Sequence, residues 1–423
     1  LRLGLLTGAC FLYVALFGKW TSSMLTLGLI AIAVPFCILT GRFVGIWAWR
    51  KPWAERFMVS PALDLMQTMP TFAYLIPMLL LFGNSPVSAM MATAIFATPP
   101  MVRATMLGLS RIPPEISDFS EMAGCTTRQK LWRVQLPSAR PTLMVGVNQV
   151  IMLALNMVII SSMIGAGGLG YDVLLALRAL KVGNAMEAGL AIVAIAIALD
   201  RLSQAMAAKQ ARGHVHQDDD VRSFYRRYPN LVLAIAALLV TTVLSLAIPA
   251  FAKVPAEITI STARAWKDAV TWVTINWFDA IEAFRVTLIL YVLNPLRAFC
   301  EGFPWLGAVF LLGLAGFQLG GWRLAATVAA LTAICAATGL WEKTMATVYL
   351  CGISAFVACL IGIPLGLMAS RSDRFERILT PIIDTLQTMP SFCFIIPVVM
   401  LFRIGDVTAM IATVAFAVVP AIR

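Results

Sequence analysis

Residues 64–72 read DLMQTMPTF, and residues 384–392 read DTLQTMPSF. Each stretch places an aspartate, a glutamine, a threonine and a proline inside a long apolar run. The match is wider than these nine residues, because residues 61–103 align with residues 381–423 without a gap and 20 of the 43 positions are identical. The chain therefore contains an internal duplication, which predicts one architecture built twice.

The composition predicts an all-α protein with many membrane spans. Apolar residues make up 60% of the chain and charged residues 13%, whereas soluble domains have roughly 45–50% and about 25%. Several apolar runs reach the roughly 20 residues that a helix needs to cross a bilayer. The alternating pattern of an outer-membrane barrel is missing. We expect spans at 62–82, 230–250, 304–320 and 322–340, among others.

The basic residues indicate how these spans are oriented. The net charge is +11, and lysines and arginines gather in three polar stretches within 50–56, 111–140 and 201–227. This is the positive-inside pattern, so we place the three stretches in the cytoplasm and expect no nucleic-acid partner. Both copies of the duplication then have the same orientation, unlike the inverted repeats of many secondary transporters.

Cysteine and histidine do not form a metal-binding pattern. The eight cysteines include no CxxC pair, and most lie in apolar runs, where cysteine behaves as a small hydrophobic residue. His214 and His216 are the only histidines, and no cysteine is near them. We therefore expect no metal site and no cofactor in this chain.

The second basic stretch contains IPPEISDFSEMAGCTTRQKLWRVQLPSARP, residues 112–141. Two prolines, Pro113 and Pro114, can open a helix, and Gly124 suits the left-handed turn that ends one. Thr126 or Thr127 can cap a second short helix that ends at Pro137. The stretch predicts a cytoplasmic helix–turn–helix, with an ordinary solvated loop as the alternative.

The same stretch resembles the EAA loop of ABC importer permeases, in which EAA is followed by three residues, Gly, nine residues and Ile-x-Leu-Pro. The spacing is matched throughout, although Asp replaces Glu and Phe-Ser replaces Ala-Ala. The resemblance assigns contact with an ATPase to Asp118, Phe119, Ser120, Gly124, Val134, Leu136 and Pro137.

Longer segments, including PALDLMQTMPTFAYLIPMLLLFG and ALDRLSQA, look like the permease subunit of osmoprotectant importers. The resemblance implies a type I ABC importer transmembrane domain, duplicated here, in a bacterial inner membrane. It implies a small osmolyte substrate such as glycine betaine, proline betaine, choline or trimethylamine N-oxide. The implied partners are an extracytoplasmic binding protein and two ATPase subunits that bind ATP and Mg²⁺. The chain has no G-x-x-x-x-G-K-[ST] loop, so we expect no enzymatic activity of its own.

The duplication also gives the expected organisation. Gly18–Met24 pairs with Gly339–Met345, with a one-residue slip near Phe57. We expect a first permease unit that lacks its first span, a cytoplasmic linker, an extra span with an extracytoplasmic amphipathic segment, and the front half of a second unit without its coupling loop. The expected ranges are 1–206 with its loop at 111–140, 207–229, 230–303 and 304–423.

Polar residues within the duplicated span predict the wall of a pathway. Asp64 and Asp384 each follow a proline, so we expect them at a helix start near the cytoplasm. Pro70 and Pro77 should kink the span, and polar residues at membrane depth face a partner helix or a wet cavity. The pore candidates are Gln67, Thr68, Met69, Pro70 and Phe72, with Gln387, Thr388, Met389, Pro390 and Phe392 in the second copy. Packing against neighbouring spans remains the alternative.

Two further features lie between 140 and 170. Asn148 and Asn156 are polar at membrane depth and are also pore candidates. The glycines of SSMIGAGGLG predict an outer gate or a binding-protein contact at Gly165, Gly167, Gly168 and Gly170. A plain re-entrant turn is the alternative.

Two other classes of function compete with an ABC permease. An ion-coupled secondary carrier for similar osmolytes would need charged residues within its spans, which have almost no acids beyond the expected helix starts. A membrane scaffold or sensor would use the linker at 201–229 for signalling. The matched spacing of the loop favours the ABC permease.

Overall fold

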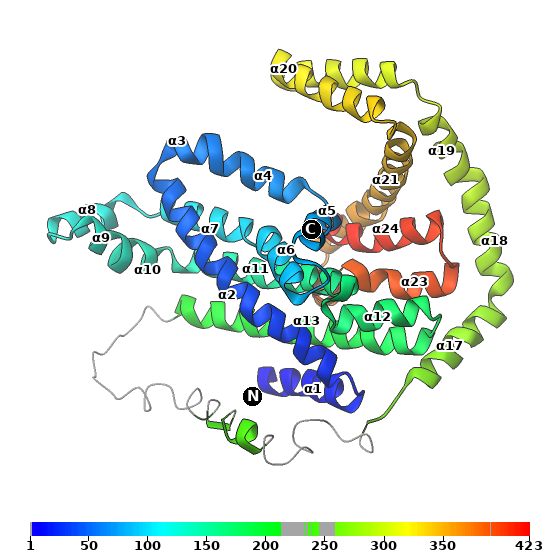
Figure 1. Cartoon of the computed structure of the whole chain (residues 1–423), viewed down its shortest axis with the longest axis horizontal. Helices are drawn as coiled ribbons and strands as arrows, with labels where there is room; N and C mark the ends of the chain where they lie inside the picture. Colours follow the sequence, from blue (N-terminus) through cyan, green and yellow to red (C-terminus); the bar gives the residue numbers. More distant parts are fainter. Residues whose placement is uncertain (1, 213–232, 234–235, 238, 245–258, 390) are drawn as a thin grey trace. The chain divides into compact units, whose positions relative to one another are not determined.

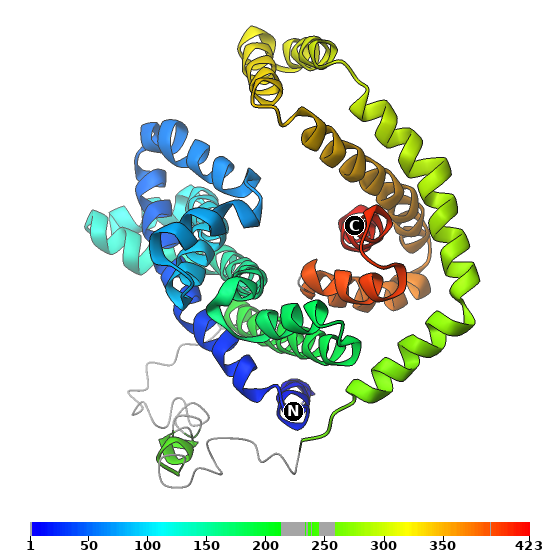
Figure 2. The ribbon, with the colours of Figure 1, turned by 45° about the vertical axis from the view of Figure 1, so that its right-hand side comes forward.

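The computed structural model describes residues 2–212, 233, 236–237, 239–244, 259–389 and 391–423. Within these residues the chain is built from helices and has no strand, which confirms the predicted all-α class (Figures 1 and 2). Two compact units are present: residues 1–266 with 388–393, and residues 267–387 with 394–423. Most of the predicted linker and of the span expected at 230–250 lies outside the described residues.

The first unit contains α1 (Arg2–Leu16), α2 (Trp20–Arg50), α3 (Pro52–Ala54), η1 (Glu55–Val59), α4 (Ser60–Thr68), α5 (Thr71–Phe82), α6 (Pro86–Ala97), α7 (Pro99–Ser110), α8 (Pro114–Met122), α9 (Thr127–Gln129), η2 (Lys130–Gln135), α10 (Leu136–Ser138), α11 (Arg140–Ser161), η3 (Ser162–Ala166), α12 (Leu169–Arg178) and α13 (Val182–Arg212). The long helices α2, α11 and α13 each carry a segment that is long and apolar enough to cross a membrane.

The second unit holds most of α17 (Ala263–Asn276), then α18 (Phe278–Leu288), η4 (Ile289–Leu293), α19 (Asn294–Glu301), α20 (Trp305–Ala337), α21 (Trp341–Arg371), α22 (Asp373–Thr388), η5 (Ser391–Phe394), α23 (Ile395–Phe402) and α24 (Asp406–Ile422). Helix α20 breaks at Gly320 and Gly321 and folds back as two antiparallel arms (Figure 1). The sequence predicts two spans in this region, at 304–320 and 322–340, and the break lies between them.

A close helix contact is repeated in both units. In the first, a Cβ on Gly41 would lie 2.6 Å from the Met101 Cβ, and one on Gly45 would lie 2.6 Å from the Thr105 Cβ. In the second, the aligned Gly362 and Gly366 lie equally close to the end of α24. Small residues four apart let helix backbones approach in a membrane. The pairing of α2 with α7, and of α21 with α24, therefore rests on these glycines.

The span predicted at 62–82 is broken. Helices α4 and α5 are bent by 99° relative to one another, and Pro70 between them has φ −58° and ψ 142°, outside the helical region. A proline cannot donate the helical hydrogen bond, and the residue before it is biased toward extended backbone. The predicted interruption at Pro70 is confirmed, whereas Pro77 is accommodated inside α5.

The predicted position of Asp64 at a helix start is wrong. Helical structure already runs through η1, where the backbone N–H of Ser60 donates to the Glu55 carbonyl, so Asp64 lies inside the helix. Asp384 lies well inside α22. Instead of capping, Asp64 Oδ1 accepts a hydrogen bond from Arg103 at 2.5 Å, and Asp384 does the same from Arg423 at 2.5 Å. Both copies thus tie the aspartate to the same aligned arginine.

These two ion pairs are half-exposed, and exposed pairs contribute about 0.2–1 kcal/mol. We expect Asp64→Ala to lower the melting temperature of the purified protein only slightly, because one weak contact is lost. The charge exchange Asp64→Arg with Arg103→Asp should recover most of that loss. A melting temperature that falls as far in the exchanged variant as in the single variant would show that the pairing itself does not matter.

Three π-helical turns each end two residues before a proline. These are η1 before Pro61, η2 before Pro137 and η4 before Pro295. A proline ring collides with the carbonyl four residues earlier, and a π-turn moves that carbonyl by widening the helix. The second helix of the 112–141 stretch therefore passes Pro137 and ends at Ser138, one residue beyond the predicted end.

Candidate functional site

Residues 112–141 form the predicted helix–turn–helix. Helix α8 begins at Pro114, and Gly124 has φ +70° at the turn. Thr126 caps the second helix through a capping box, since the Gln129 N–H donates to Thr126 Oγ1 at 3.3 Å and the Thr126 N–H donates to Gln129 Oε1 at 2.9 Å. We call residues 114–138 the coupling hairpin, after the ATPase contact that the sequence predicts for it. The hairpin projects from one end of the first unit (Figure 1).

Contacts on its inner side hold the coupling hairpin in place. Lys130 Nζ lies 2.5 Å from Glu121 Oε1 and joins the two helices. This hydrogen bond from Lys130 lowers the pKa of Glu121, so its contribution is present at neutral pH and is lost as pH falls through the lowered value. Leu131 is buried, and the Trp132 ring lies 5.9 Å from the Arg42 guanidinium of α2. The second helix is therefore fastened to α2.

The outer side of α8 is exposed and partly apolar. Phe119 is 68% exposed and Met122 is 81% exposed, and their spacing of three residues puts them on the same face. Asp118 beside them is exposed, whereas Ser120 is buried and donates to the Ser117 carbonyl at 2.6 Å. Two neighbouring apolar side chains that are exposed on one helix face can form part of a protein contact surface.

The remaining residues of the loop motif differ in position. Leu136 is buried, Val134 is half-buried, and Pro137 is exposed in the first turn of α10. Asp118 and Phe119 of the motif thus lie at the surface, whereas Leu136 packs in the interior.

The pore candidates of the first copy do not share one environment. Met69 packs against the buried cluster around Tyr74 and Met157. Thr68 Oγ1 donates to the Leu65 carbonyl at 3.2 Å, and Gln67 is exposed. Phe72 is half-exposed and lines a cavity. Phe72 thus connects this span to the cavity described below.

The second copy is described less completely. Gln387 is exposed and Met389 is half-buried. Pro390 lies outside the described residues, and the side chains of Thr388 and Phe392 do as well.

The two asparagines of α11 are both half-buried. Asn148 Oδ1 is buried and has no hydrogen-bond partner among the described residues. An unpaired polar atom at membrane depth is expensive, so Asn148 remains a good pathway candidate.

An open cavity of about 520 Å³ lies in the first unit between α5, η3 and α12. This volume falls within the roughly 300–1,000 Å³ of small-molecule sites. Its polar lining comes from Asn84, Tyr171 and Arg178, and its apolar lining from Phe72, Met163, Leu174 and Leu175. We call it the outer cavity, because α12 lies on the side opposite to the coupling hairpin in the predicted orientation.

The glycine-rich turn forms one edge of the outer cavity. Gly165 lines it with φ +113°, and a Cβ there would lie 1.8 Å from Asn84 Oδ1. Gly170 is buried, and a Cβ there would lie 2.1 Å from the Ile159 carbonyl oxygen. The turn is fixed to α2, since the Leu169 N–H donates to Thr26 Oγ1 at 3.1 Å. Gly167 and Gly168 lie between them, both with positive φ.

Two residues of the outer cavity are site candidates from the sequence, Phe72 for the pore and Gly165 for the outer gate, whereas Asn84, Tyr171 and Arg178 are not. The three lie in a turn and on a short helix, where polar residues are ordinary. The duplication offered one signal for Asn84. The aligned residue of the second copy is Ile404, so the amide at this position is specific to the first copy.

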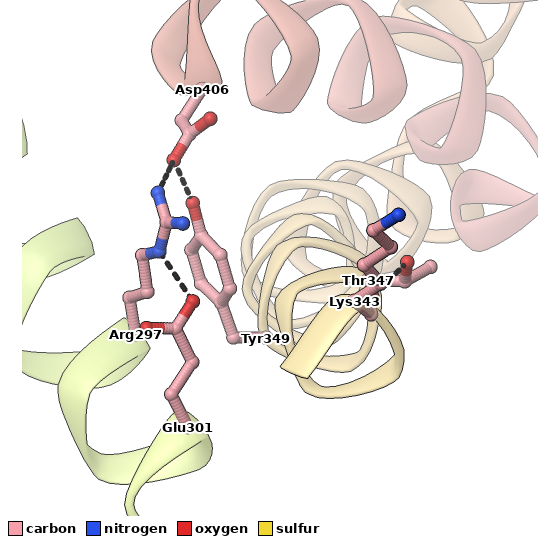
Figure 3. A network of polar contacts seen from close by, with 6 residues as sticks. All are labelled: Arg297, Glu301, Lys343, Thr347, Tyr349 and Asp406. Atoms are coloured by element: carbon pink, nitrogen blue, oxygen red, sulfur yellow. Dashed lines mark hydrogen bonds and ion pairs between the residues drawn. The ribbon is translucent and has the colours of Figure 1, made fainter. Parts of the chain in front are cut away.

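The second unit has a polar network of its own (Figure 3). Tyr349 donates to the Asp406 carboxylate, Arg297 Nη1 lies 3.6 Å from Asp406 Oδ2, and Arg297 Nε donates to Glu301 at 2.6 Å. These residues come from α19, α21 and α24 above a core of Leu293, Val407 and Met410. The network joins α19 to the repeated helices α21 and α24. The first copy has a glycine at the position aligned with Tyr349 and a proline at the position aligned with Asp406, so it cannot form the same contact.

Among the described residues, no group of three or more histidine, cysteine or acidic side chains could hold a metal ion. By length and composition alone, six described helices could cross a membrane. They include Phe278–Glu301 and also α20, whose two arms fold back at Gly320 and Gly321. The assignment of Phe278–Glu301 to an extracytoplasmic amphipathic segment stays a prediction.

Comparison with known proteins gives the family. The family model described as "Binding-protein-dependent transport system inner membrane component" matches residues 33–213 and 362–423. The trimethylamine N-oxide transport system permease protein TmoV of Pelagibacter ubique is 36% identical over 100% of this chain and 59% of its own length. The glycine betaine transport system permease protein OpuAB of Bacillus subtilis is 45% identical over 48% of this chain and 72% of its own length.

A TmoV from Ruegeria pomeroyi is 34% identical and is covered over 64% of its length, so the chain spans about three-fifths of the two TmoV proteins. Among solved structures, an inward-facing MetNI methionine ABC transporter chain has 21% identity, with a TM-score of 0.40 over 46% of this chain and 94% of that chain. The family match covers both copies of the duplication and more than half of the residues. The chain therefore belongs to the binding-protein-dependent inner membrane components, the multi-pass permeases of ABC importers.

Proposed function

We propose that this chain forms the transmembrane pathway of an ATP-driven importer for a small methylated amine. The substrates named for its relatives are trimethylamine N-oxide and glycine betaine, and choline and proline betaine belong to the same chemical class. The importer works by alternating access. An extracytoplasmic binding protein delivers the substrate, and two copies of an ATPase subunit bind ATP and Mg²⁺, so this chain is not itself an enzyme.

The observation that carries the proposal is the coupling hairpin. Its inner side is fastened by the Glu121–Lys130 pair and buried Leu131, while its outer side exposes Phe119 and Met122. A short rigid helix with an exposed apolar face can transmit the closure of an ATPase dimer to the spans, whereas a mobile loop would absorb it.

Uptake into vesicles tests the proposal. The complete transporter is reconstituted with its ATPase and binding protein, and uptake of labelled trimethylamine N-oxide is measured with ATP enclosed. We expect uptake to require hydrolysable ATP, and we expect the uptake rate to be independent of sodium and proton gradients. Uptake that persists without ATP and follows an ion gradient would instead support the secondary carrier.

A further inference from the structure

The outer cavity combines two kinds of surface that one small ligand would need. Its lining residues include Arg178, Asn84 and Tyr171, which carry hydrogen-bond donors, and Phe72, Met163 and Leu174, which are apolar. A zwitterionic methylated amine has the matching two ends: an oxyanion, and a nitrogen covered by methyl groups.

The duplication shows that Asn84 is not required to build its turn. In the first copy Gly83 has φ +66°, and in the second copy the aligned Arg403 has φ +62°. The two turns thus share this backbone conformation, although Ile404 replaces Asn84. The backbone of this turn therefore does not depend on the Asn84 amide, which lies against Gly165 at the edge of the outer cavity.

The Arg178 guanidinium has no hydrogen-bond partner among the side chains and carbonyls of the described residues. Arg178 occupies the last turn of α12, is exposed, and forms no ion pair with any of these residues. A cation is favourable at the end of a helix for electrostatic reasons alone, and that role would be satisfied equally by lysine or by any basic residue nearby. Arg178 also lies in the wall of the outer cavity.

We propose that the outer cavity is a substrate subsite for zwitterionic methylated amines, in which Arg178 and Asn84 donate hydrogen bonds to the oxyanion. Arginine recognises carboxylate-like oxygens through its fork of donors. The rings of Phe72 and Tyr171 offer faces to the methylated nitrogen, as aromatic rings do for quaternary ammonium groups. The subsite accepts the betaine carboxylate or the N-oxide oxygen and does not favour a plain cation. This inference rests on the proposed function.

Uptake by the reconstituted transporter tests the subsite, with the binding protein saturated by trimethylamine N-oxide. We expect Arg178→Gln to reduce the uptake rate at least tenfold and Arg178→Lys to retain an intermediate rate, because the charge is kept. Asn84→Ile, the residue that the second copy already carries, should reduce the rate several-fold without lowering the melting temperature. Arg264→Gln is the matched control, since Arg264 is exposed and lies outside the cavity, and it should transport at the wild-type rate.

The outcomes separate the two proposals. Wild-type rates in both Arg178→Gln and Asn84→Ile would overturn the subsite and leave ATP-driven import standing. Equal losses in Arg178→Gln and Arg264→Gln would also overturn it, because the effect would then follow net charge. If the wild-type transporter shows no ATP-dependent uptake of any methylated amine, the proposed function itself fails.

Discussion

Gly124→Val is expected to abolish transport while the protein still inserts and folds. Gly124 has φ +70°, and no atom lies within 4 Å of the place where a Cβ would stand. The effect therefore comes from the backbone alone: a left-handed conformation costs an L-residue about 1–2 kcal/mol, and a β-branched side chain tolerates it worst. The turn between α8 and α9 would open, and the Glu121–Lys130 pair that joins the two helices would separate.

The measurement is ATP hydrolysis stimulated by the binding protein in the reconstituted transporter. We expect stimulation to fall more than tenfold in Gly124→Val, with a melting temperature close to wild type because the hairpin lies outside the spans. Gly124→Asn is the matched control, since asparagine adopts the left-handed conformation more readily than other residues. Full stimulation in the valine variant would remove the coupling role from the hairpin.

Gly170→Val has the largest expected effect on folding. A Cβ on Gly170 would lie 2.1 Å from the Ile159 carbonyl oxygen and 2.3 Å from Ser162 Oγ, and the backbone oxygen cannot rotate away. Overpacking a buried site costs about 1–3 kcal/mol, and here α12 would have to move away from η3. We expect a loss of several degrees in melting temperature and a collapse of the outer cavity that α12 lines.

Gly28→Ala provides the comparison. Gly28 lies inside α2, and no atom lies within 4 Å of the position that its Cβ would occupy, so alanine should be neutral or stabilising by up to about 1 kcal/mol. Thermal melting in detergent distinguishes the two variants. If Gly170→Val melts with the wild type yet transports poorly, the glycine serves motion at a gate and not close packing.

Local signals predicted the parts of the fold that depend on neighbouring residues. The proline pair, Gly124 and Thr126 define the coupling hairpin because capping and turn formation involve only three or four residues. The break at Pro70 follows from the chemistry of one residue. The duplication predicted that both copies would form alike, and the repeated glycine contacts agree with it.

Contacts between residues that are far apart in the chain could not be predicted from the sequence. Asp64 was expected to act on its own helix end, whereas its partner Arg103 is 39 residues away. A signal existed, because the aspartate and the arginine are both identical in the two copies. The outer cavity gave no such signal, since its lining comes from separate elements whose approach depends on tertiary packing.

The π-turn at 55–59 also explains the one-residue slip between the two copies. Between the last residue of α2 and Pro61, the first copy has one residue more than the second copy has between the last residue of α21 and Pro381. The second copy forms α22 there without a π-turn. A π-turn contains one residue more than an α-turn. The π-turn at 55–59 therefore accommodates the additional residue of the first copy as a local bulge.

This places an insertion or a deletion in the history of the duplicated gene at a known point of the backbone. The bulge confined the change in length to one turn, so that Asp64 and Asp384 still reach the same aligned arginine. A one-residue deletion within 55–59 should therefore be absorbed by converting the bulge to a regular turn. The helix preceding the break is thus a place where the two copies of this chain differ in length without losing register.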